Sequence, residues 1–165
     1  MAILSSAALW FFPFVLPLCI YTCYTDMREM RITNGTVVTL FLVFVVIGPL
    51  ALPFEDYLCR YAYFGAVLVA GMALNAAGAM GAGDAKFAAA AAPFIHIGDL
   101  RFLMVLFAAT LLAAFASHRL AKYTPLRKIA PDWESWDAPS KKFPMGLALG
   151  GTLAIYLGLG ILYGR

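Results

Sequence analysis

The chain has 165 residues, of which 63% are hydrophobic and 13% are charged, and its mean hydropathy is +0.84. A soluble domain needs a larger share of polar residues to cover its surface, so this composition excludes a soluble protein and indicates an integral membrane protein. The formal net charge of +3 adds little, and we expect no nucleic-acid partner. The surrounding membrane lipid is the first partner that the composition predicts.

The apolar runs predict an all-α polytopic membrane protein with about six transmembrane helices of about 20 residues each. The first three spans are expected at about 3–24, 36–53 and 61–80. A short fourth span should begin near residue 82, and the fifth and sixth are expected at about 100–116 and 143–163. The fourth is the shortest, with about 17 residues, at the lower limit of what crosses a bilayer. No basic segment precedes the first run, which we interpret as a retained helix rather than a cleaved signal peptide. Residues 1–165 are therefore expected to form a single membrane-embedded domain.

The basic residues predict the orientation of these spans. Nine of the twelve Lys and Arg residues fall on one predicted side: Arg28, Arg31, Lys86, Arg119, Lys122, Arg127, Lys128, Lys141 and Lys142. The other side receives Arg60, Arg101 and Arg165. Because basic loops stay in the cytoplasm, both termini should lie outside it and the loops near Asp26 and Asp84 inside it.

One short stretch carries an ionisable group between two apolar runs, the sequence Gly81-Ala82-Gly83-Asp84-Ala85-Lys86. A carboxylate at membrane depth is costly and usually marks function, so Asp84 is a candidate site residue. Between Asp26 and Asp84 the chain crosses the membrane out and back, which returns both carboxylates to the same face. Two close carboxylates do not both ionise easily, so one can hold a proton while the other deprotonates a water that attacks an amide carbonyl. This pattern predicts aspartic-peptidase chemistry, with Asp26 and Asp84 as the catalytic pair.

The neighbouring residues have candidate roles in binding a substrate. Gly81 and Gly83 would let a substrate backbone come close and would permit a sharp entry to the next helix. Lys86 could contact substrate or hold the motif, and the alternative is that it extends toward the membrane interface. We expect Asn34 mainly to cap the second span and less to touch substrate. Asn75, inside the third span, is expected to hydrogen-bond to another helix.

Metal-binding and disulfide patterns are absent from the sequence. The three cysteines, Cys19, Cys23 and Cys59, form no CxxC pair, and their odd number predicts neither a disulfide framework nor a zinc site. His96 and His118 fall on opposite predicted faces of the membrane and should not share an ion. We therefore expect no metal and no cofactor.

These motifs resemble those of the GxGD membrane aspartic peptidases, and among them the type IV prepilin peptidases. The stretch 81–86 is similar to the family's GxGDxK motif, and Asp26 followed by 31–34 is similar to its first-aspartate segment, with Thr33 in place of a proline. The stretch 143–146 resembles the family's Pro-Tyr-Gly segment, with Met145 in place of tyrosine.

The resemblance implies a membrane endopeptidase that removes the leader of a prepilin at the cytoplasmic membrane face. Such a leader is short, basic and ends in glycine, directly before a hydrophobic segment. The absence of paired CxxC motifs implies the short, peptidase-only branch found with tight-adherence (Flp) pili or archaeal preflagellins, without a separate methyltransferase or zinc domain. The implied location is the bacterial or archaeal cytoplasmic (inner) membrane.

Two other function classes are compatible with parts of the sequence. A small proton-coupled transporter or channel subunit would use Asp26 and Asp84 as a proton relay. Such a relay needs carboxylates spread across the bilayer, whereas these two are predicted at one face. A scaffold protein would leave the glycines of the motif unexplained. The sequence does not identify the pilin or the oligomeric state.

Overall fold

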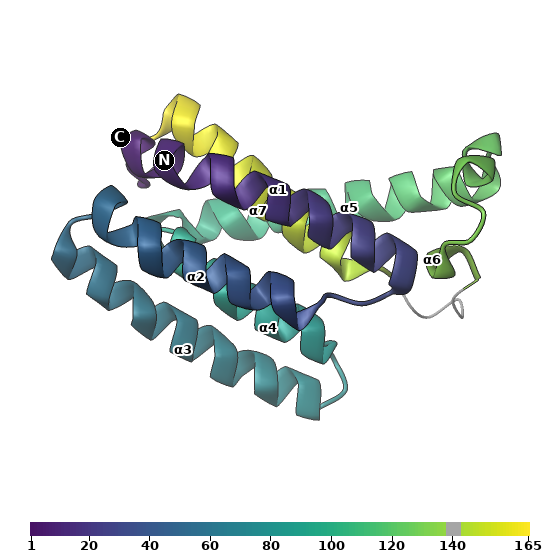
Figure 1. Cartoon of the computed structure of the whole chain (residues 1–165), viewed down its shortest axis with the longest axis horizontal. Coiled ribbons are helices and arrows are strands. Elements are labelled where there is room, and N and C mark those ends of the chain that lie inside the picture. The colour runs from purple at the N-terminus through teal and green to yellow at the C-terminus, as the bar shows by residue number, and fades with distance from the viewer. Residues whose placement is uncertain (138–142) are drawn as a thin grey trace.

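The computed structural model describes residues 1–137 and 143–165, and these are almost entirely helical (Figure 1). The α-helices are α1 (Ser5–Glu29), α2 (Asn34–Ala51), α3 (Phe54–Ala76), α4 (Ala82–Ala91), α5 (Leu100–Tyr123), α6 (Glu134–Asp137) and α7 (Met145–Tyr163). Three short 3₁₀-helices join them: η1 (Ala92–Phe94), η2 (Ile97–Asp99) and η3 (Pro125–Ile129). No β-strand occurs in these two ranges. Lys141 and Lys142, counted in the basic bias, lie outside the described residues.

Five helical segments are long and apolar enough to cross a membrane: α1, α2, α3, α7, and the segment Ile97–Tyr123 that contains α5. Many of their large apolar side chains are exposed, such as Val46 at 64% and Val105 at 70%. In water this exposure would be unfavourable, whereas lipid tails satisfy it. The predicted fold class, an all-α polytopic membrane protein, is thus confirmed.

The first and last helices form the centre of the fold. α1 and α7 run antiparallel and side by side (Figure 1), and α2 and α5 pack against this pair from different sides. The chain ends meet, because the Ser5 amide donates to the Arg165 carbonyl at 2.9 Å and the Arg165 amide donates to the Ile3 carbonyl at 2.9 Å. Both termini therefore lie at one end of the bundle, and the α1–α2 and α3–α4 connections lie at the other end (Figure 1).

The predicted fourth span differs from the structure, because α4 is only 10 residues long. It is followed by η1, where Pro93 has no N–H group with which to continue the helical ladder. α4 lies very close to α3: a Cβ atom on Gly71 would be only 2.9 Å from the Cβ of Ala85. Small residues on both helices thus allow their backbones to approach and fix the start of α4 against α3.

The end of this short helix is held by a buried arginine. Arg60 on α3 is 4% exposed, and its Nη1 donates to the carbonyl of Pro93 at 2.8 Å. In an apolar environment this carbonyl would otherwise lack a partner. The sequence placed Arg60 among the charges at the outer membrane face. In the structure the side chain turns inward and bonds the chain that follows α4, so Arg60 adds no exposed charge at that end of the bundle.

We predict that Arg60→Ala lowers the free energy of unfolding by about 1–3 kcal/mol, because the buried carbonyl of Pro93 loses its donor. The measurement is denaturant unfolding of the purified protein in detergent micelles. Arg101→Ala, which removes an exposed arginine, is the matched control and should change stability little. Equal stability of the two variants would show that the Arg60 hydrogen bond does not hold α4.

Candidate functional site

Asp26 lies inside the last turn of α1, because this helix extends to Glu29, beyond its predicted end near residue 24. The helix ends at Met30, which has the left-handed φ of 50° and donates its amide to the Asp26 carbonyl at 3.0 Å. The Asp26 side chain is only 5% exposed. A carboxylate so deeply buried requires a partner.

That partner is the first turn of α7. The amide of Gly146 donates to Oδ2 of Asp26 at 2.6 Å, across 120 residues of sequence. Gly146 is the second residue of α7, where unpaired amides and the helix dipole favour a negative group. A Cβ on Gly146 would lie 2.9 Å from both the Cβ and Oδ2 of Asp26. Only glycine therefore lets the two helices meet at this carboxylate.

Asp84 lies in the first turn of another helix, α4. It is the third residue of α4, whose N-cap is Gly81. A Cβ on Gly81 would lie 2.6 Å from Oδ2 of Asp84, so glycine leaves the space that this carboxylate fills. Burial raises the pKa of Asp84, and a hydrogen bond from the Gly81 amide offsets part of this rise. Asp84 thus keeps its proton to a higher pH than an aspartate in water.

The two carboxylates line one cavity of about 850 Å³ and are close enough to interact electrostatically. Its walls come from the α1–α2 connection, the α3–α4 connection, the start of α4, α5 and the start of α7. Besides the two aspartates, the residues that line the cavity include Arg31, Asn34, Gly81, Gly83, Lys86, Leu111, Phe143 and Met145. The structure therefore brings together every site residue that the sequence predicted. Their roles in binding and catalysis are proposals.

Lys86 and Asn34 bind each other across this cavity wall. Nζ of Lys86 donates to Oδ1 of Asn34 at 3.2 Å and so ties α4 to the start of α2. The expectation that Asn34 caps the second span is wrong. The cap is Thr33, whose Oγ1 accepts from the Thr36 amide at 3.2 Å. Because Thr33 serves as the cap, the Asn34 amide group is available to Lys86.

Gly83 faces the α1–α2 connection. A Cβ on this residue would lie 3.4 Å from the Cβ of Ile32, an ordinary van der Waals contact. The two glycines of the motif therefore differ, since Gly81 makes room for a carboxylate and Gly83 packs against a neighbouring loop.

The α3–α4 connection is held in a fixed shape. The amides of Gly78 and Ala79 donate back to the carbonyls of Asn75 and Leu74, both at 2.9 Å, and Gly78 has a φ of +73°. This is a Schellman motif, in which the left-handed position requires glycine. Nδ2 of Asn75 then donates to the Met80 carbonyl at 2.8 Å. The expectation that Asn75 bonds another helix is therefore wrong, since it orders the loop before Gly81.

The sequence did not reveal the Gly146 amide as the partner of Asp26. The signal was present in the stretch 143–146, a proline followed by glycine at the start of an apolar helix. Without the fold, nothing linked that helix start to a carboxylate 120 residues away.

The arrangement suits proton transfer. Two carboxylates from separate helices face the same cavity, which has room for water. Each carboxylate receives a hydrogen bond from a glycine amide. Such a pair can share one proton and act together as general acid and base. Among the residues that the structure describes, no group of three or more His, Cys, Asp or Glu side chains could hold a metal ion.

We predict that Gly146→Ala lowers the free energy of unfolding by about 1–3 kcal/mol, because the added methyl group collides with Asp26. Gly151→Ala is the matched control on the same helix, where a Cβ would meet nothing within 4 Å. That change should leave stability unchanged or slightly raised, since alanine favours helix more than glycine. Chemical denaturation of both variants in detergent compares them, and a Gly146→Ala protein as stable as the control would contradict the close contact.

A comparison with protein families gives a match over the region that contains both aspartates. The family model described as the type IV leader peptidase family matches residues 13–117, more than half of the chain. No curated protein and no solved structure gives a significant match. The matched region includes α2, α3 and α4 together with most of α1 and α5, and thus all the residues that line the cavity except Phe143 and Met145. The chain therefore belongs to the type IV leader peptidase family.

Proposed function

We propose that this chain is a membrane aspartic endopeptidase that cleaves the leader peptide from type IV prepilin-like proteins. The observation that carries this proposal is the meeting of Asp26 and Asp84, from α1 and α4, in one cavity of about 850 Å³. Family membership supports a leader peptidase, and the paired carboxylates support the aspartic mechanism. Residues 1–165 would act as one membrane-embedded peptidase domain.

In the proposed reaction, one carboxylate takes a proton from a water molecule as the water oxygen attacks the scissile carbonyl carbon. The other carboxyl group donates its proton to the carbonyl oxygen, which gives a neutral tetrahedral intermediate. When the C–N bond breaks, the leaving nitrogen accepts a proton from one carboxyl group, a hydroxyl of the intermediate gives its proton to the other carboxylate, and the leader departs with a new carboxyl group. The amides of Gly146 and Gly81 hold the two side chains in place throughout.

The proposed binding residues are Gly81, Gly83, Lys86 and Asn34, which all line the cavity beside the carboxylates. A basic leader would be attracted by the two acidic groups. Lys86 is paired with Asn34, so we propose that it mainly fixes the wall of the cavity.

We further propose that the cavity opens at the cytoplasmic face of the bacterial or archaeal cytoplasmic (inner) membrane. Most of the described basic residues lie near the end of the bundle that carries the two carboxylates, on α1, α4, α5, η3 and the α1–α2 connection. Because Arg60 is buried, Arg101 and Arg165 are the only exposed basic residues near the other end within residues 1–137 and 143–165. Basic residues favour the cytoplasmic side.

Asp26→Asn and Asp84→Asn are each expected to reduce cleavage of a prepilin by roughly 10²–10⁴-fold, because removing either group leaves half of an acid–base pair. The double variant should be no worse than the single variants, since the two groups act as one unit. The measurement is the cleavage rate in proteoliposomes, with protein level and thermal stability as controls. Substantial cleavage by either single variant would contradict the pair and favour a proton relay.

The orientation is tested by thiol labelling. A membrane-impermeant maleimide applied to intact cells should label Cys59, which is exposed. A cysteine placed by Lys122→Cys in a variant that lacks Cys59 should react only after the cells are permeabilised. Labelling of that cysteine in intact cells, together with protection of Cys59, would place the cavity on the outer face.

A further inference from the structure

Cys23 lies one turn before Asp26 on α1 and faces the same residue of α7. Its thiol Sγ donates to the carbonyls of Gly146 and Leu147, both at 3.8 Å. Gly146 is also the residue whose amide donates to Oδ2 of Asp26 at 2.6 Å. α1 therefore holds Gly146 at both of its backbone polar groups, the amide through a carboxylate and the carbonyl through a thiol.

The Cys23 side chain also helps to set the spacing of the two helices. A thiol is a weak donor, so the volume that it fills matters beside its hydrogen bonds. A Cβ on Gly150, one turn after Gly146, would lie only 3.0 Å from Sγ of Cys23 and 2.9 Å from the carbonyl oxygen of Cys19. α7 thus presents glycine at two successive turns, and the side chain at position 23 packs directly against its backbone.

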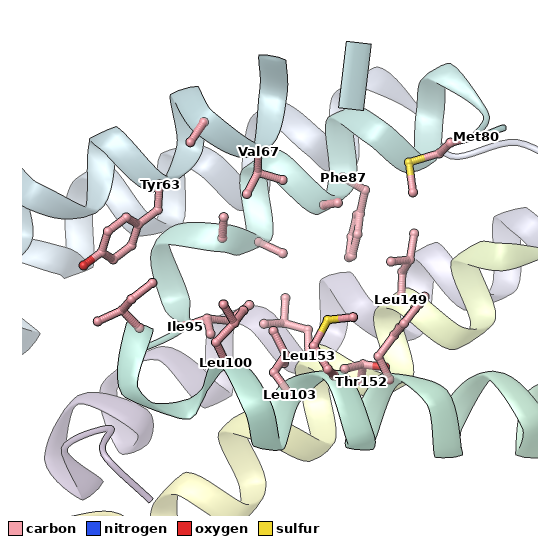
Figure 2. Close-up of a pocket in the computed structure, with 17 residues that line it drawn as sticks. Tyr63, Val67, Met80, Phe87, Ile95, Leu100, Leu103, Leu149, Thr152 and Leu153 are labelled. Atoms are coloured by element: carbon pink, nitrogen blue, oxygen red, sulfur yellow. The ribbon is translucent and has the colours of Figure 1, made fainter. Parts of the chain in front are cut away.

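The start of α7 has space to move away from α1. Beside α7 lies a second cavity, of about 390 Å³, which Leu149, Thr152 and Leu153 of this helix line (Figure 2). A closely packed neighbour would resist displacement, whereas an open space does not. A larger side chain at position 23 is therefore expected to shift α7 and to draw the Gly146 amide away from Asp26.

We propose that Cys23 is a positioning residue, whose thiol holds the Gly146 peptide where its amide meets the Asp26 carboxylate. This inference rests on the proposed function, in which Asp26 is half of an acid–base pair. Cys23 does not line the carboxylate cavity, so it acts through Gly146 rather than on the substrate. Precise placement matters because a displacement of about 1 Å can cost up to about 10²-fold in rate.

The competing explanation is that Cys23 only packs α1 against α7. Cys19 separates the two explanations, because it lies one turn earlier on the same face of α1, is 1% exposed, and has its carbonyl close to Gly150. A packing role predicts similar effects of the same substitution at both positions. A positioning role predicts that only position 23 affects catalysis.

The first test compares Cys23→Val with Cys19→Val, since both changes replace a thiol by a branched apolar group that cannot donate. Both variants should lose thermal stability. In proteoliposomes with a prepilin substrate, Cys23→Val should lower kcat by roughly tenfold and leave KM within about twofold, because the residues that line the cavity are unchanged. Cys19→Val should leave both constants within about twofold of wild type.

The pH profile of kcat is a readout that a loss of packing does not move. An amide that donates to a carboxylate favours its charged form, so a weakened bond lets Asp26 take up a proton at higher pH. The acidic limb should therefore move to higher pH in Cys23→Val and stay in place in Cys19→Val. Cys23→Ala, which removes the donor without adding volume, should move it in the same direction by less. The other charged groups that line the cavity are the same in all variants: Asp84, Arg31 and Lys86.

The second test does not depend on cleavage. Met-Gly pairs occur in the sequence only at Met80-Gly81 and Met145-Gly146. Labelling Met with carbonyl ¹³C and Gly with ¹⁵N thus selects, by NMR in detergent micelles, the two amides that donate to Asp84 and Asp26. In Cys23→Val the Gly146 signal should shift and its pH midpoint should rise, whereas the Gly81 signal should change much less and serves as the internal control.

A Gly146 signal that matches wild type in both Cys23→Val and Cys23→Ala would overturn the inference. Equal effects of Cys23→Val and Cys19→Val on kcat and on the acidic limb would also overturn it, in favour of packing alone. If wild type cleaves no prepilin, the proposed function fails, while the NMR signals still decide whether Cys23 positions the Gly146 amide.

Discussion

The contact between α1 and α7 at Asp26 is the interaction on which the site depends. A carboxylate that is 5% exposed receives the Gly146 amide at 2.6 Å, and no side chain fits between them. The same contact joins the first helix of the chain to the last and places an acidic group at the positive end of a helix. Stability and site geometry are therefore coupled here, since any change that separates the two helices also moves the carboxylate.

The second carboxylate is positioned by a different constraint, the shortness of α4. This helix begins with the Gly81–Asp84 turn, lies against α3 at Gly71, and ends before Pro93, where Arg60 bonds the chain. A short helix that does not cross the bilayer is tolerated at membrane depth only where its terminal backbone groups find hydrogen-bond partners within the protein. The start of α4 is thus held against α3 and the α1–α2 connection without a helix that spans the full bilayer.

The apolar runs were sufficient to predict the helical class, and counting the crossings predicted that Asp26 and Asp84 return to one end of the bundle. Local sequence could not predict what depends on tertiary contacts. The sequence counted Arg60 only as a charge on one side of the membrane, because its buried partner, the Pro93 carbonyl, lies 33 residues further along the chain. Asn34 was preferred as a helix cap because asparagine suits that position, but in the structure Thr33 accepts the Thr36 amide and Asn34 accepts from Lys86.

The central claim is that the two carboxylates cleave one peptide bond between a basic leader and an apolar helix. The most direct measurement is the intact mass of a purified prepilin after incubation with the purified wild-type protein in proteoliposomes. The account predicts two products, a leader that ends in glycine and a pilin that begins with the next residue, whose masses sum to that of the substrate plus one water. An unchanged substrate mass, with folded enzyme present, would contradict the claim.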